Sequence, residues 1–93
     1  MIAEYKPLTK FRASLTSICR AVQAGKKEVI VTFHQQPVFK VVKLKNDEIE
    51  PSIPERSFVQ VVRNQSEFLD AIERYDAVIL TARNKRLVRC EKI

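Results

Sequence analysis

Two hairpin-like patterns, one in each half of the 93 residues, constrain the fold more than any other feature of the sequence. In the first half, the runs Val29–Phe33 and Val38–Leu44 are separated by residues 34–37, which read His-Gln-Gln-Pro. In the second half, Ala77–Ala82 and Leu87–Ile93 are separated by residues 83–86, which read Arg-Asn-Lys-Arg. Runs rich in β-branched residues around a short connection are typical of β-hairpins. Apolar residues occupy both alternating sets of positions, which predicts a sheet covered on both faces.

The two hairpin patterns can be aligned without a gap. In this alignment, Val29–Thr32 matches Val78–Thr81, and Val38–Lys40 matches Leu87–Arg89. We interpret this alignment as a degenerate internal repeat of a strand–helix–hairpin unit, in which one half packs on the other as a pseudo-dimer. The alternative is a chance match between short β-rich segments, and the sequence alone leaves both open.

An amphipathic helix is predicted before the first hairpin. Apolar residues recur there at the spacing that places side chains along one stripe of an α-helix. Thr9 is the predicted N-cap and Gly25 the predicted stop, so the helix should cover residues 10–24, with Arg12 and Arg20 on its polar face. The apolar stripe consists of Phe11, Leu15, Ile18, Cys19 and Val22.

The second half begins after a proline-containing acidic segment, residues 46–57, which is predicted to be a linker between residues 1–45 and 58–93. Phe58–Val62 has the composition of a strand, and Asn64 followed by Glu67 indicates the start of another helix. The apolar face of that helix consists of Phe68, Leu69, Ile72 and Tyr75. The sequence therefore predicts an α+β fold, an antiparallel sheet of hairpins with helices packed on it, in which both halves share one core.

The formal net charge of +6 is distributed unevenly along the chain. Residues 6–45 are strongly basic, residues 46–80 are mainly acidic, and residues 81–93 are basic again. A basic block attracts phosphate backbones through its long-range field and through counterion release, whereas an acidic block repels them. The pattern favours a polyanionic partner for the first half; ordinary charge scatter on a solvated surface is the alternative.

Several short motifs follow one another in residues 1–45. They are Arg12 and Leu15 as an R-x-x-L at the helix start, Gly25 at the helix end, Val29–Thr32 as a strand and Pro37–Val42 as the returning strand. This ordered combination resembles the DNA-binding half of Phd/YefM-type antitoxins. It implies a homodimeric module that represses transcription in the cytoplasm by binding operator DNA, with a toxin protein as a further partner. Arg12 matches the arginine at the helix start of that family.

Arg12 and the residues around it are the candidate DNA contacts. A guanidinium near a helix N-terminus can donate bidentate hydrogen bonds to phosphate or to a guanine edge. The alternative for Arg12 is a surface ion pair with a local carboxylate. His34 stands in the hairpin turn, where the family pattern T-R-R-G-x-P carries basic residues; its alternative is a polar turn residue. The candidate DNA-binding residues are Thr9, Lys10, Arg12, Arg20, Lys26, Lys27 and His34.

A protein-interaction module that binds no DNA is the alternative function. In that hypothesis, the acidic side of the second predicted helix docks a basic partner protein. An RNA-binding domain is less favoured, because few aromatic side chains are placed to stack on unpaired bases. The candidate partner-binding residues are Glu67, Asp70, Glu73 and Asp76.

Catalysis, cofactors and membrane insertion are not expected. A single histidine and no glycine-flanked serine argue against a hydrolase triad, and the carboxylates of residues 46–57 stand in a proline-bounded segment that would not hold a catalytic Mg²⁺. Gly25 is the only glycine, which excludes a glycine-rich nucleotide loop. Cys19 and Cys90 are expected to be free thiols without a metal ion. No apolar run is long enough to span a bilayer, and we predict a cytoplasmic location.

Overall fold

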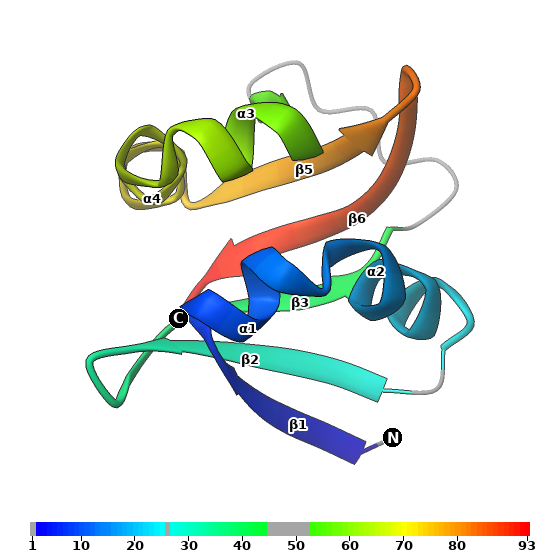
Figure 1. Ribbon diagram of the computed structural model, residues 1–93, viewed down its shortest axis with the longest axis vertical. Coiled ribbons are helices and arrows are strands. Elements are labelled where there is room, and N and C mark those ends of the chain that lie inside the picture. Colours follow the sequence, from blue (N-terminus) through cyan, green and yellow to red (C-terminus); the bar gives the residue numbers. More distant parts are fainter. Residues whose placement is uncertain (1, 26, 45–52) are drawn as a thin grey trace.

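The same order of strand, helix, helix, strand and strand occurs in each half of the chain in the computed structural model, which describes residues 2–25, 27–44 and 53–93 (Figure 1). The first half contains β1 (Ile2–Pro7), α1 (Leu8–Ala13), α2 (Leu15–Gln23), β2 (Lys27–Phe33) and β3 (Gln36–Lys43). The second half contains β4 (Glu55–Ser57), α3 (Phe58–Arg63), α4 (Gln65–Tyr75), β5 (Ala77–Ala82) and β6 (Lys85–Lys92). The predicted linker 46–57 lies outside the described residues up to residue 52, and its last three residues form β4.

The six strands form one sheet in the order β1-β2-β3-β6-β5-β4. The α+β class is confirmed, but the sheet is mixed and not wholly antiparallel as predicted. β1 pairs parallel with β2, and β4 pairs parallel with β5, whereas the other neighbours are antiparallel. The physical reason is the helix pair between the two strands of each parallel pair, which carries the chain back across the sheet so that the next strand runs in the same direction.

The predicted helix over residues 10–24 is two helices that meet at Ser14. Ser14 departs from helical geometry, with φ −125° and ψ 28°, and its backbone N–H donates to the carbonyls of Lys10 and Phe11. The predicted N-cap Thr9 is wrong, because α1 already begins at Leu8, after the extended residue Pro7. The apolar stripe is nevertheless confirmed, since every one of its predicted residues is buried.

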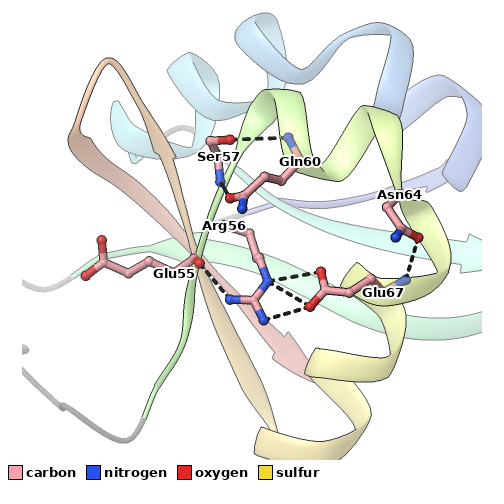
Figure 2. Close-up of polar contacts among 6 residues, drawn as sticks. All are labelled: Glu55, Arg56, Ser57, Gln60, Asn64 and Glu67. Carbon is pink, nitrogen blue, oxygen red and sulfur yellow. Dashed lines mark hydrogen bonds and ion pairs between the residues drawn. The ribbon is translucent and has the colours of Figure 1, made fainter.

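The segment Phe58–Val62, predicted to be a strand, is part of helix α3. A capping box starts this helix: the backbone N–H of Gln60 donates to Ser57 Oγ (3.2 Å), and the backbone N–H of Ser57 donates to Gln60 Oε1 (2.8 Å) (Figure 2). These two bonds satisfy donors that a helix start otherwise leaves open. Val61 is then the buried residue of the helix, while Val59 is 57% exposed.

All four helices cover the same face of the sheet. Their buried side chains form one cluster with alternate residues of β2, β3, β5 and β6, so the two halves share a hydrophobic core (Figure 1). Phe11 of α1, Phe39 of β3 and Phe68 of α4 meet at its centre, with ring centroids 5.3 to 6.4 Å apart. Tyr75, which was predicted to lie on the apolar face of α4, is 47% exposed at the end of that helix.

The prediction that both faces of the sheet are covered is right only for part of the sheet. On the face opposite the helices, Ala77 and Ile79 of β5 are buried against Ile53 and the half-buried Leu44. On the same face of the first half, Ile30 is half-buried, and its neighbour Tyr5 on the edge strand β1 is 64% exposed.

Both hairpins turn in two residues, which is shorter than the predicted four-residue connections. His34 and Gln35 adopt φ of 52° and 65°, and Arg83 and Asn84 adopt φ of 52° and 63°. Two consecutive residues of positive φ are the signature of a type I′ turn, whose twist matches that of the flanking strands. Each hairpin also has a register shift at the same place, between Val31 and Thr32 of β2 and between Leu80 and Thr81 of β5.

Candidate nucleic-acid interface

The helix layer carries exposed basic side chains that make no ion pair with the described part of the chain. Each helix contributes one of them: Lys10, Arg20, Arg63 and Arg74. Other exposed basic side chains also make no ion pair with the described residues, namely Lys43 at the end of β3 and Arg83 and Lys85 at the β5–β6 turn. The described carboxylates without an ion pair are fewer, namely Glu28, Asp70 and Asp76. Within the residues that the structure describes, the charge left free for a partner is therefore mainly positive.

Arg12 connects the two halves of the molecule. Its Nη1 donates to Gln65 Oε1 at 2.9 Å, and its Nη2 donates to the carbonyl oxygen of Val62 at 2.8 Å. Its Nε is buried without an acceptor among the described residues. Arg12 was the leading DNA candidate on sequence grounds, but the structure places it half-buried in a seam between α1 and the α3–α4 corner. Its partners are a carbonyl and an amide, not the local carboxylate of the alternative hypothesis. We conclude that it positions the helices.

Replacing Arg12 by alanine should lower the free energy of unfolding by about 1–3 kcal/mol, because hydrogen bonds from a charged donor are worth about 1.5–3 kcal/mol each and this group is partly solvated. Urea denaturation followed by circular dichroism measures the change. Arg20→Ala is the matched control, since Arg20 is an exposed arginine in α2 without an ion pair, and it should stay within about 0.5 kcal/mol of wild type. Equal stability of the two variants would contradict the role given to Arg12.

The structure divides the other DNA candidates between the helix layer and the β2 region of the sheet. Thr9 and Lys10 are exposed on α1, and Arg20 is exposed on α2. Lys27 and His34 belong to opposite ends of the β2 region: Lys27 Nζ lies 2.6 Å from Glu4 Oε2, whereas His34 is exposed in the turn with its ring against Phe33. Lys27, with Lys6, lowers the pKa of Glu4, and its charge is engaged there. Lys26 lies outside the described residues.

Several free cations were missed on sequence grounds, namely Lys43, Arg63, Arg74, Arg83 and Lys85. The last two belong to the Arg-Asn-Lys-Arg run of residues 83–86, which was a readable signal because it aligns with the turn that holds His34. Arg63 and Arg74 had no comparable signal. Their availability depends on which carboxylates the fold brings near. Helix α3 contains no acidic residue, and two of the three acidic residues of α4, Glu67 and Glu73, pair with Arg56 and Lys92.

The acidic side of α4 is largely engaged within the protein. Arg56 holds Glu67 with three hydrogen bonds, from Nε to both carboxylate oxygens (3.0 Å each) and from Nη2 to Oε1 (2.7 Å) (Figure 2). These bonds lower the pKa of Glu67 and raise that of Arg56. Glu73 lies 3.1 Å from Lys92 Nζ. Of the predicted partner-binding residues, only Asp70 and Asp76 remain exposed without an ion pair, and Asp76 is the left-handed C-cap of α4.

The chemistry available elsewhere in the described residues is limited. No three side chains of His, Cys, Asp or Glu in this part of the chain gather into a group that could hold a metal ion. No helix within residues 2–25, 27–44 and 53–93 is long and apolar enough to cross a membrane. Both thiols are free and buried; burial raises the pKa of Cys19 to about 12 and that of Cys90 well above its ordinary value. Such thiols are protonated and unreactive near neutral pH.

Comparison with protein-family models, with curated proteins and with solved structures found no match for this chain. The resemblance to Phd/YefM antitoxins therefore stays a prediction from the sequence.

Proposed function

We propose that this protein binds duplex DNA, as an antitoxin-like repressor does, through the helix-covered face and the β5–β6 turn. The observation that carries the proposal is the set of exposed cations without an ion pair among the described residues, one on each of the four helices and two more at the turn. Lysine and arginine side chains that face phosphates release condensed counterions, which supplies most of the affinity in non-specific binding. Arg12 keeps α1 in place next to this surface and is not itself a principal contact.

The proposal includes an internal repeat of a Phd/YefM-like unit. Its support is the identical order of elements in the two halves and the matching positions of the parallel strand pair, the register shift and the type I′ turn. β3 and β6 also show the same succession of exposed and buried residues. The proposal also includes a location in the cytoplasm, which is supported by the lack of a long apolar run in the sequence, and neutralisation of a toxin partner, which is supported by the sequence resemblance alone.

The alternative, an acidic docking surface for a basic protein, has less support. Two of its four carboxylates, Glu67 and Glu73, already form ion pairs within the chain. A basic partner would have to displace Arg56 from a bidentate ion pair, and the cost of breaking that pair would weaken the complex.

DNA binding is tested by fluorescence anisotropy with a labelled duplex of about 20 base pairs, roughly two helical turns, titrated over a range of salt concentrations. The test variant removes the four helix cations together, by Lys10→Gln, Arg20→Gln, Arg63→Gln and Arg74→Gln. The slope of log K against log salt should decrease in magnitude by about 0.9 for each phosphate that is no longer neutralised. Lys40→Gln is the control, because Lys40 pairs with Glu91 on the opposite face of the sheet. Its slope should equal that of wild type.

Absence of duplex binding by the wild-type protein at low salt would refute the proposed function. A quadruple variant with wild-type affinity and slope would refute the assignment of the surface.

A further inference from the structure

The tip of the β5–β6 hairpin extends beyond the rest of the sheet. The pairing of β4 with β5 ends at Ser57 and Thr81, and the pairing of β3 with β6 ends at Lys43 and Val88. Residues 82–87 of the hairpin therefore have no described neighbour strand on either side. Figure 1 shows this part of the hairpin rising past the sheet at the upper right. A projecting two-stranded ribbon has the dimensions that the major groove of B-DNA admits.

This tip is basic, whereas the corresponding tip in the first half is not. In the alignment of the two halves, Arg83 and Lys85 correspond to His34 and Gln36. Arg86 is engaged by Glu55, with its Nη2 2.7 Å from Glu55 Oε2, so Arg83 and Lys85 are the cations of this tip without an ion pair among the described residues. Backbone geometry at the two turns is nearly the same, and the difference between them is therefore one of charge.

The centre of the sheet has the arrangement expected of a two-fold dimer interface. β3 and β6 pair antiparallel, and Val41 stands opposite Cys90. The same two residues correspond to each other in the alignment, so a local two-fold axis passes between them. In a symmetric homodimer this strand pairing would join two chains; here both strands come from one chain, and the two hairpin tips lie on either side of the axis (Figure 1).

We propose that one copy of this chain covers a whole DNA site with two unequal halves, and that the β5–β6 turn holds the tighter half through Arg83 and Lys85. The proposal rests on the proposed DNA binding. The molecule measures 32 Å along its longest axis, close to the roughly 34 Å of one turn of B-DNA, so a single chain is large enough to face one whole turn. The single chain then takes the place of the homodimer expected from the resemblance.

The test compares matched changes at the two turns, on duplexes of about 20 base pairs selected by the wild-type protein from a random pool. Arg83→Gln/Lys85→Gln should reduce the salt slope by about 1.8 and the affinity roughly 10- to 100-fold at about 0.1 M salt, because two phosphates are no longer neutralised. Glutamine is tolerated at positive φ in the sister turn, at Gln35. The control His34→Gln/Gln36→Asn should change the affinity less than about two-fold, since no cation is removed.

The converse variant, His34→Arg/Gln36→Lys, copies the basic turn into the first half and should raise the salt slope by about the same 1.8. Sedimentation velocity should give the mass of one chain on each selected duplex. Two chains per duplex, or equal decreases in affinity from the changes at the two turns, would overturn this inference while DNA binding stands. No binding by the wild-type protein would instead overturn the proposed function, and this inference with it.

Discussion

Replacing Phe68 by alanine should lower the free energy of unfolding by about 3–5 kcal/mol, the usual cost of removing a fully buried phenylalanine side chain. Phe68 is completely buried and belongs to the second half of the chain, yet its ring stacks on Phe11 at 6.4 Å and meets the edge of Phe39 at 5.5 Å, both in the first half. Total stabilities of small domains are about 5–15 kcal/mol, so this single change should remove a large part of the stability.

Urea denaturation measured by circular dichroism and by fluorescence tests the prediction. Because the three rings join both halves in one core, the variant should still unfold in one transition that both probes report at the same urea concentration. Val59→Ala is the control at an exposed apolar position, with an expected change within about 0.5 kcal/mol. A decrease below about 1.5 kcal/mol, or two separate transitions, would contradict the shared core.

Raising the pH above about 9 should destabilise the protein through its two thiols. In the unfolded chain Cys19 and Cys90 lose their protons near the ordinary thiol pKa of about 8.5. In the folded protein burial raises both pKa values, that of Cys19 to about 12, so the folded state keeps its protons. A group whose pKa is raised by folding contributes its stability below the unfolded pKa and loses it as the pH rises toward the folded one. Each thiol should therefore remove about 1.4 kcal/mol per pH unit in this range.

The measurement is the free energy of unfolding at a series of pH values between about 7 and 10.5, below the folded pKa of Cys19. The quantity of interest is the difference in this pH dependence from the Cys19→Ala/Cys90→Ala variant, because that difference isolates the contribution of the two thiols. That variant should be less stable near neutral pH, because it leaves cavities, but its stability should fall less steeply with rising pH. Parallel pH profiles for the two proteins would contradict the prediction.

Only one of the two errors in the helix and strand assignment has a cause that is visible in the local sequence. Phe58–Val62 is rich in β-branched residues, which favour strands, but Ser57 and Gln60 form the S-x-x-Q capping box that starts a helix. That signal was present in the sequence and was outweighed by composition. The break of the first helix at Ser14 was not readable in this way, since the apolar stripe continues through it at helical spacing and both helices bury their share of it.

The candidate interface was only partly predictable. The basic character of α1 and α2 followed from sequence, and Lys10 and Arg20 are exposed as expected. The hydrogen bonds of Arg12 and Lys27 within the protein could not be predicted, because their partners, Gln65 and Glu4, are distant in the chain. Counting basic residues along the sequence cannot distinguish a free cation from one whose charge is already satisfied.

Sequence alone determined the α+β class, the two hairpins and the residues that face the core from the first helical region, because alternation and helical spacing are local consequences of where apolar side chains must point. Tertiary structure decided the parallel strand pairs, the central contact of β3 with β6 and the identity of the free cations. These depend on which segments meet after the chain has crossed the sheet. The contacts of Lys27 with Glu4 and of Arg12 with Gln65 join residues that are 23 and 53 positions apart in the sequence. Such contacts arise from the packing of whole elements and leave no local pattern in the sequence.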